Sequence, residues 1–556
     1  MADEEQDVWG KDGVLSFPIN CDDVLAQLNQ DMRDDWFFDT IHYKDLFAGK
    51  HDLKSLISDL LLEGNGRYSA SSRQICDIPK KGLGIRYSLE TDFYDRFIYQ
   101  AICSFLIKHY DPLLSHRALG HRYNKESKDK RYLFKNRIDL WKTFEGVTFT
   151  AFEDKKVLLS TDIINYFENI SIESIRTAFE KKLHQVKGTG KKIFQIRNAI
   201  DTLCDLLSRW SFSDRHGLPQ NRDASSFIAN VVLSEVDRKL VELGYDYYRY
   251  VDDIRIICDN PHQARKALHQ LIAELRTVGM NINSAKTEIL TYEDSSQTIS
   301  KFFPNNDDRT SAIDTMWKSR SRRVIARSIP LIHQMVKNCI EQKETQSRQF
   351  RFSVNRLAML IDADIFDVGS ELSDQLVQLL LSTLQEQAAS TDQYCRLLSM
   401  FELSANALGE IEDYLGDDEK SIYQWQNYHL WFVLARKKHK TENLIEIAKR
   451  KIENNVLSNE TPAIFIYLYC IGEESSLRAL VKKLDSTWPY MHQRYFLFAT
   501  KDFTIDELKP LFNVLGTKVK GTVRRASKHF AADGHPLAQR EKSTISHIYE
   551  NISPYD

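Results

Sequence analysis

Two adjacent aspartates inside a β-type segment place the strongest constraint on how this chain folds. Residues 246–258 read DYYRYVDDIRIIC, so Asp252 and Asp253 interrupt a run of aromatic and β-branched residues. Such residues are typical of packed strands, and the acids between them predict a β-hairpin that turns at the doublet. A surface turn also accommodates aspartate, but the apolar flanks favour a buried hairpin whose two like charges require compensation.

Another aspartate follows a strand pattern earlier in the chain. Residues 157–170 read VLLSTDIINYFENI, in which a β-branched strand ends at Asp162 and an aromatic pair follows. Two strands that deliver aspartates to one sheet edge bring Asp162 beside the doublet. Carboxylates at such a separation repel one another unless cations lie between them. We therefore expect two Mg²⁺ ions, with Mn²⁺ as a substitute, about 3.5 to 4 Å apart. This is the carboxylate set of nucleotidyl transfer.

Segments on either side of these motifs, over roughly residues 75–295, resemble the fingers and palm of reverse transcriptases. Asp162 corresponds to the first aspartate motif of that family and YVDD to the second. IPKKGLGIRYSLETDFYDRFIYQAI is similar to the fingers segment of group II intron and retron enzymes. LSHRALGHRYN, with Gly120 and Arg122, resembles the segment that follows. GLPQNRDASSFIANVVLSEVD resembles the P-Q-G-x-x-x-S-P-x-L-x-N motif, and VGMNINSAKTEIL the next one.

The resemblance implies a role for each matching residue. The metal ligands would be Asp162, the Ile163 backbone, Asp252 and Asp253, and Lys286 would give a proton to the leaving pyrophosphate. The deoxynucleoside triphosphate would be held by Lys80, Lys81, Arg86, Phe167 and Gln220. Lysine and arginine suit phosphate, one as a point charge and the other as a fork. Phe167 would exclude a 2′-hydroxyl as a steric gate, although an isolated phenylalanine more often packs in a core.

The chain departs from the family pattern in the third of these segments. Asn221 stands where most relatives have glycine, Arg222 and Asp223 follow it, and Ser226 stands where they have proline. Glycine at that point lets backbone approach a template base closely. A side chain there predicts altered use of a template.

The composition indicates a large folded chain with two or more domains. We predict an α+β fold with reverse-transcriptase fingers and palm, followed by an all-α, HEAT-like helical-repeat domain. Leucines recur at helical spacing in ELSDQLVQLLLSTL, and later segments show apolar residues at the same spacing. These patterns support the helical C-terminal domain. The expected boundaries are an N-terminal segment at 1–70, fingers and palm at 71–305, a basic connector at 306–330 and the helical repeat at 331–556.

This architecture resembles the abortive-infection and other defence-associated reverse transcriptases of bacteria. The resemblance implies antiphage defence, DNA synthesis that is template-independent and protein-primed, and assembly into a homo-oligomer. Tyr43, in DTIHYKDLF, is a candidate priming residue, although ordinary amphipathic packing explains it more simply. A conventional RNA-templated reverse transcriptase, an RNA-synthesising polymerase with the same palm and a catalytically silent nucleic-acid-binding scaffold are the alternatives.

Two basic segments are candidates for a single-stranded DNA or RNA path. The net charge of −3 is nearly neutral, so a nucleic acid must be bound by local patches. The candidates are Arg122, Lys130, Arg131 and Lys135 in the first segment, and Arg322 and Arg323 in the second. In the first, aromatic residues interleave with the cations, as in single-strand grooves. A solvated helix face is the alternative for both.

The remaining features place the chain in a reducing compartment. The start MADEEQDVWGKDG has no apolar leader, and the apolar run 464–471 is too short to cross a bilayer. Eight single cysteines without a C-x-x-C pair argue against structural zinc and disulfides. We expect a protein of the bacterial cytoplasm with no membrane partner.

Overall fold

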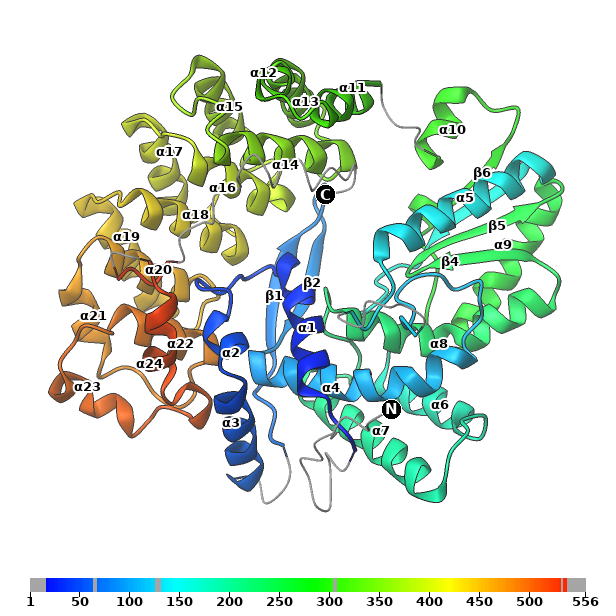
Figure 1. The fold of residues 1–556 in the computed structure, drawn as a ribbon, viewed down its shortest axis with the longest axis horizontal. Helices are drawn as coiled ribbons and strands as arrows, with labels where there is room; N and C mark the ends of the chain where they lie inside the picture. Colours follow the sequence, from blue (N-terminus) through cyan, green and yellow to red (C-terminus); the bar gives the residue numbers. More distant parts are fainter. Residues whose placement is uncertain (1–16, 64–67, 126–131, 304–307, 532–533, 538–556) are drawn as a thin grey trace. The chain divides into compact units, whose positions relative to one another are not determined.

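The computed structural model describes residues 17–63, 68–125, 132–303, 308–531 and 534–537. The chain divides into two compact units (Figure 1). The first comprises the described parts of Met1–Asp35, Lys50–Ile75 and Ser88–Asn305. The second comprises Trp36–Gly49, Cys76–Tyr87 and the described part of Asn306–Asp556.

The first unit combines helices with one central sheet. Several helices begin at side-chain caps; Asn20, for example, accepts hydrogen bonds from two backbone amides of the first turn of α1. The elements are α1 (Cys21–Asp31), η1 (Met32–Asp34), α3 (Lys50–Glu63), α4 (Phe93–Tyr110), η2 (Asp111–Leu113), α5 (Arg137–Lys155), β3 (Val157–Asp162), α6 (Ile172–Leu183), α7 (Gly190–Trp210), α8 (Asp223–Glu242), β4 (Asp246–Tyr250), β5 (Asp253–Cys258), α9 (Pro261–Arg276), η3 (Ser284–Lys286), β6 (Glu288–Thr291) and α10 (Ser296–Phe302).

The central sheet is antiparallel and has the strand order β4-β5-β3-β6. Side chains alternate between its faces. On one face Leu158, Ile257 and Leu290 pack with Phe152 of α5. The alternate residues Leu159 and Ile256 are fully buried as well, and α9 contacts β3, β5 and β6. Both faces of the sheet are therefore covered. Only the ends of the strands remain accessible as a place where a substrate could bind.

The strands β1 (Gln74–Pro79) and β2 (Ile85–Glu90) form a separate two-stranded sheet. The Lys80 amide donates to the Gly84 carbonyl at 2.8 Å, and Gly82 has a φ of +84°. That positive φ lies in the region that glycine adopts without steric penalty, which explains the tight KKGLG connection. Its tip, Cys76–Tyr87, belongs to the second unit.

Apart from that tip, the elements of the second unit are all helical in the part of the chain that the structure describes. They are α2 (Lys44–Ala48), α11 (Asp308–Lys318), α12 (Arg322–Ala326), α13 (Ile329–Glu341), α14 (Arg348–Asp362), α15 (Glu371–Ser382), η4 (Ala388–Ser390), α16 (Thr391–Met400), α17 (Ala405–Gly416), α18 (Gln424–Lys437), α19 (Glu442–Asn454), α20 (Thr461–Cys470), α21 (Glu474–Leu480), α22 (Tyr490–Ala499), α23 (Ile505–Phe512), η5 (Thr517–Val519), α24 (Thr522–Ala526) and η6 (Ser527–His529).

These helices pack in two rows. The even-numbered helices from α14 to α22 each contact the next even one, and the odd-numbered helices from α13 to α19 each contact the next odd one. Each pair adds one helix to each row, which is how helical pairs stack into a solenoid. The prediction of a largely helical C-terminal region is therefore confirmed.

The segment Trp36–Gly49 is built into this helical unit. Arg494 of α22 donates to both Asp39 and Asp45, at 2.7 Å for the shortest contact to each, and all three side chains are fully buried. The Phe38 carbonyl accepts hydrogen bonds from Tyr428 at 2.7 Å and Tyr495 at 2.8 Å. Since one guanidinium neutralises two buried acids here, losing it would leave unpaired buried charge.

The compact units differ from the expected domain boundaries in two places. The expected boundary at 305 matches the division at Asn305, but Trp36–Gly49 and Cys76–Tyr87 group with the helical unit. The expected connector at 306–330 is largely helical, as α11 and α12. All eight cysteines are buried free thiols. Among the described residues, no helix is long and apolar enough to cross a membrane.

Candidate active site

The three aspartates lie at one end of the β3–β5 pair. Asp162 is the last residue of β3 and stands directly opposite Asp253, the first residue of β5. Asp252 lies in the two-residue turn between β4 and β5, and its carbonyl oxygen accepts a hydrogen bond from the Ile163 amide at 3.2 Å. The structure thus brings together the three acids singled out from the sequence, together with the Ile163 backbone.

The other residue of this turn, Val251, has an unusual backbone conformation. Its φ is +57°, which for a β-branched residue stores about 1 to 3 kcal/mol of strain and persists only where the surroundings enforce it. The Val251 carbonyl accepts a hydrogen bond from Arg249 Nη1 at 2.9 Å, and the same nitrogen donates to Asn230 Oδ1 at 2.9 Å. Arg249 therefore holds the turn that carries the aspartate doublet.

Arg249 is itself fixed by a buried carboxylate on α8. Its Nε and Nη2 atoms donate to the two oxygens of Asp237 at 2.8 and 2.7 Å, and the side chains are only 1% and 0% exposed. Although burial opposes it, Asp237 raises the pKa of Arg249. Such a two-pronged pair is geometrically specific, so it fixes the direction of β4 relative to α8.

Gly120 lets a neighbouring loop approach the strained turn. A Cβ atom at this position would lie 2.9 Å from Val251 Cγ2 and 3.0 Å from the Val251 nitrogen. The Gly120 carbonyl also accepts a hydrogen bond from Asn230 Nδ2 at 2.7 Å. Gly120 is therefore a constrained position of this segment, because only glycine fits against the turn.

Mutual repulsion dominates the electrostatics of the cluster. Burial first, and then the charges of Asp252 and Asp162, raise the pKa of Asp253 to about 7. Lys286, at the end of η3, lies with its Nζ 2.5 Å from Asp162 Oδ2. Despite partial burial, the hydrogen bond and charge of Asp162 raise the pKa of Lys286, which keeps it an ammonium. The cluster accepts a positive charge.

These residues fit a pair of divalent metal ions by their chemistry. Three aspartate carboxylates and a backbone group offer oxygen ligands only, which is the set that Mg²⁺ prefers. Among the described residues, no group of three His, Cys, Asp or Glu side chains already converges to hold a metal. In this structure Lys286 supplies the positive charge at Asp162.

Phe167 and Gln220 lie on two loops that are tied together. The Leu218 amide donates to the Phe167 carbonyl at 2.9 Å, and Gln220 Nε2 donates to Glu168 Oε1 at 3.3 Å. Phe167 is partly exposed and packs edge-on against the buried ring of Tyr166. It therefore does not lie in a core, which is the alternative explanation for a phenylalanine at this position.

Asn221 retains the backbone conformation that a glycine would provide. Its φ is +54°, in the left-handed region that asparagine adopts more readily than most residues. The chain thus keeps a turn at this point despite the missing glycine. What changes is the side chain that the turn carries.

The three cations expected to hold the triphosphate lie on the β1–β2 tip in the second unit. Lys81 is exposed, Lys80 is half-buried, and the Arg86 guanidinium lies 5.4 Å from the ring centroid of Trp36. The tip thus presents cations to solvent, and an aromatic face orients one of them.

Arg122, a candidate for the nucleic-acid path, is bound by groups of its own loop. Its guanidinium donates to Asp111 Oδ1 at 2.7 Å and to the carbonyls of Ser115 and Ala118 at 2.8 and 2.7 Å. These contacts fold the loop back on itself and engage donors that a phosphate would use, which favours a structural role for Arg122. Lys135 is exposed, whereas Lys130 and Arg131 lie outside the described residues.

The connector cations and the candidate priming residue both lie in the second unit. Arg322 and Arg323 of α12 are exposed, as expected for a phosphate contact. Tyr43 is only 8% exposed, and its ring packs against the Arg494 guanidinium at 4.9 Å. A priming hydroxyl must reach the reacting phosphate, so this packing favours a structural role for Tyr43.

Three residues of the site were not predicted from the sequence: Arg249, Asp237 and Asn230. One signal was present, since β4 alternates and Arg249 shares its buried face with Tyr247. An arginine on the buried face of an alternating strand requires an acid partner. Nothing in the sequence indicates which acid this is.

The site lies within a segment that matches a known family. Residues 78–352 match the family model described as reverse transcriptase (RNA-dependent DNA polymerase). This segment belongs to the reverse transcriptase family, and the chain is accordingly a nucleotidyltransferase. The match contains all three aspartates and continues through α11–α13 into α14.

Solved structures of telomerase are among those similar to the chain. Telomerase from Candida albicans, in complex with a fragment of telomeric RNA, is 10% identical with a TM-score of 0.30, over 72% of this chain and 70% of that one. Telomerase from Candida tropicalis, with a telomeric RNA fragment, is 13% identical with a TM-score of 0.29, over 63% and 68%. Its apo form is 12% identical with a TM-score of 0.28, over 79% and 74%. No curated protein sequence matches the chain.

The close approach of Gly120 to the turn generates a first prediction. Gly120→Ala should lower kcat for nucleotide incorporation by about 10- to 100-fold, because its Cβ displaces Val251 and with it the doublet. Gly146→Ala in α5 is the control, since a Cβ there meets no atom within 4 Å. Equal kcat values for the two variants would show that the contact does not position the aspartates.

Proposed function

We propose that this chain is a Mg²⁺-dependent DNA polymerase of the reverse-transcriptase type. The observation that carries the proposal is the direct pairing of Asp162 with Asp253, beside Asp252 in a turn held by Arg249. Bound at Asp162, the Ile163 backbone, Asp252 and Asp253, two Mg²⁺ ions would lower the pKa of the attacking hydroxyl and stabilise charge on the phosphates. Mn²⁺ has the same ligand preference and would substitute for Mg²⁺.

The chain's own residues then supply binding and proton transfer. The primer hydroxyl loses its proton to solvent, and its oxygen bonds to the α-phosphorus as the bond to pyrophosphate breaks. Lys286 gives a proton to the leaving oxygen. Lys80, Lys81 and Arg86 bind the triphosphate, while Gln220 and Phe167 contact the base and sugar side of the nucleotide. Lys286 suits its role because its ammonium lies against Asp162.

The wider role that we propose is antiphage defence by abortive infection, in the bacterial cytoplasm. What supports it is the architecture: a reverse-transcriptase segment followed by a helical region, which we assign to the HEAT-like repeats. In this role the enzyme assembles as a homo-oligomer and makes DNA without a template from a protein hydroxyl. The substitution of Asn221 for glycine supports altered template use.

The aspartate doublet provides the decisive test. Asp252→Asn combined with Asp253→Asn should abolish Mg²⁺-dependent incorporation of labelled deoxynucleotides, because the paired amides cannot replace two anionic metal ligands. Asp259→Asn, an exposed acid just beyond β5, should retain the parent rate. Incorporation by the double variant would refute the polymerase proposal.

The same variants separate the defence role from the alternatives. Cells that express the parent chain should survive phage infection better than cells with the doublet variant; equal protection would favour a catalytically silent scaffold. Reactions without template and primer distinguish the modes of synthesis. Label that stays with denatured protein indicates protein priming, whereas synthesis only on added RNA template and primer indicates a conventional reverse transcriptase.

Phe167 generates a prediction about sugar selectivity. Phe167→Ala should lower the preference for deoxy- over ribonucleotides by about 10-fold or more, because the partly exposed ring no longer excludes the 2′-hydroxyl. The ratio of kcat/KM values for the two nucleotide types measures this effect. Phe194→Ala, at a highly exposed ring on α7, is the control. An unchanged ratio would assign Phe167 to packing.

We also propose that the exposed cations around α12 bind single-stranded DNA or RNA. They are Lys318, Arg320, Arg322, Arg323 and Arg327. In the described part of the chain, no ion pair neutralises any of them, and the one hydrogen bond of Arg322 goes to a neutral carbonyl, that of Asp364. Such a patch suits phosphates. Lys135, an exposed cation of the first unit, is a separate candidate contact for the nucleic acid.

Substitution of the patch should weaken binding in a salt-dependent way. Arg322→Gln with Arg323→Gln should reduce the magnitude of the slope of log affinity against log salt by about 1 to 2. A protein that makes fewer phosphate contacts displaces fewer counterions when it binds. Fluorescence anisotropy with a labelled oligonucleotide measures it. Lys449→Gln with Arg450→Gln is the control, because those cations already pair with Glu446 and Asp418. Identical slopes for both double variants would remove the patch from the path.

A further inference from the structure

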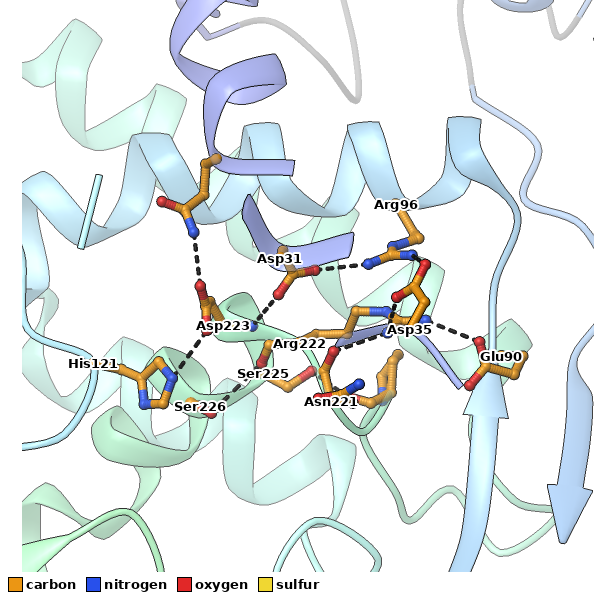
Figure 2. Close-up of polar contacts among 12 residues, drawn as sticks. Asp31, Asp35, Glu90, Arg96, His121, Asn221, Arg222, Asp223, Ser225 and Ser226 are labelled. Carbon is orange, nitrogen blue, oxygen red and sulfur yellow. Dashed lines mark hydrogen bonds and ion pairs between the residues drawn. The ribbon is translucent and has the colours of Figure 1, made fainter. Parts of the chain in front are cut away.

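A buried polar network joins the N-terminal helix of the first unit to the start of α8. Figure 2 shows its members, which come from the end of α1 and the residue after η1, from α4, from the end of β2, from the loop ahead of α8 and from the start of α8. It contains four carboxylates, those of Asp31, Asp35, Glu90 and Asp223, and the two guanidinium groups of Arg96 and Arg222. Arg222 and Asp223 directly follow Asn221, where the chain departs from the family pattern.

Arg222 is the branching point of this network. Its Nη1 donates to Asp35 Oδ1 at 3.3 Å and to the Asn221 carbonyl at 2.8 Å, and its Nη2 donates to Glu90 Oε2 at 2.9 Å (Figure 2). The arginine side chain is only 3% exposed. One rigid fork thus ties the residue after η1, the end of β2 and the turn at Asn221 to one another.

Asp223 makes the second set of contacts. Its backbone amide donates to Asp31 Oδ1 at 2.9 Å, while its carboxylate accepts from Gln27 at 2.7 Å and contacts His121 Nε2 at 3.0 Å. Although burial opposes it, the hydrogen bond and charge of His121 lower the pKa of Asp223, so that it remains an anion. The first residue of α8 is thereby fixed to α1.

Arg96 completes the connection from α4. Its Nη2 donates to Asp31 Oδ2 at 2.8 Å and its Nη1 to Asp35 Oδ2 at 2.6 Å. Each of these aspartates therefore contacts Arg96 with one oxygen and the α8 start or Arg222 with the other. Asp31 at the end of α1 and Asp35 after η1 thus connect α4 to the loop and to the start of α8.

The loop that this network holds is also the loop that borders the nucleotide site. Arg222 directly binds the carbonyl of Asn221, which follows Gln220. Two residues before Gln220, the Leu218 amide donates to the Phe167 carbonyl at 2.9 Å. Ser225, one turn into α8, donates to the Pro219 carbonyl at 2.5 Å and so anchors the loop from its other side. Displacement of Arg222 would therefore move Gln220 and the segment that carries Phe167.

We propose that Arg222 is a positioning residue for the nucleotide site, acting through the Asn221 carbonyl on Gln220 and Phe167. In this chain the ion pairs with Asp35 and Glu90 make the loop rigid. The N-terminal helix thus helps to set the geometry of the polymerase site. The inference rests on the proposed polymerase function and extends it to how the incoming nucleotide is selected.

The test compares nucleotide kinetics of Arg222 variants in the full-length chain. Arg222→Gln should raise KM for deoxynucleotides about 10-fold, change kcat less, and reduce the selectivity against ribonucleotides, because the aspartates stay in place while the loop moves. Arg222→Lys, which keeps one charge but cannot reach three acceptors at once, should give intermediate values. Glu90→Gln, which removes one charge at the better exposed edge of the network, should raise KM by about twofold to threefold.

Arg238→Gln is the matched control, because Arg238 lies on the same helix and forms exposed ion pairs with Glu235 and Glu242. Its KM and selectivity should equal those of the parent chain. Melting temperatures of all variants separate stability from positioning. A fall in melting temperature with parental KM and selectivity in Arg222→Lys and Glu90→Gln would overturn the proposal and assign the network to stability alone.

Failure of the proposed function gives a different result. If the chain is not a polymerase, the parent protein incorporates no nucleotide and all variants are equally inactive. If the chain polymerises but Arg222 does not position the loop, the parent and the folded Arg222 variants have the same KM and the same sugar selectivity.

Discussion

Repulsion between carboxylates at one edge of the sheet is the constraint on which the catalytic unit depends. The β3–β5 register places Asp162 opposite Asp253, and burial together with the neighbouring charges raises the pKa of Asp253 to about 7. An array of this kind is unfavourable without a cation, so the surrounding structure must hold it against relaxation. The Arg249–Asp237 pair and the close approach of Gly120 do so by fixing the turn between β4 and β5.

The centre of the site could be predicted from the sequence because its signals are local. A strand repeats every two residues, and acids at the ends of two apolar strands can be read directly from segments 157–162 and 246–258. The support for that centre could not be predicted, because it depends on partners distant in the chain. Arg249 could be suspected of burial, but Asp237 and Asn230 lie on a helix that carries other acids as well, Glu235 and Glu242 among them.

Charge runs were the least reliable guide. Arg122 was assigned to a nucleic-acid path because it lies among other cations, yet Asp111 and nearby carbonyls bind it. Similarly, an N-terminal aromatic segment gave no sign that Asp39 and Asp45 would pair with Arg494, far away near the end of the chain. A cation's neighbours in sequence describe its surroundings only when the fold leaves it exposed, as it does for Arg322 and Arg323.

The segment 221–223, which begins at the departure from the family motif, has two separable features. Asn221 preserves the left-handed backbone that glycine would adopt, so the turn itself survives the substitution. Arg222 adds a buried charge that contacts Asp35 and Glu90. The Asp223 carboxylate contacts Gln27 and His121, while its backbone amide donates to Asp31. A buried charge is tolerated only where its partners are fixed, and the partners of Arg222 lie beside the N-terminal helix and at the end of β2. Contacts within the first unit therefore hold this loop at both Arg222 and Asp223.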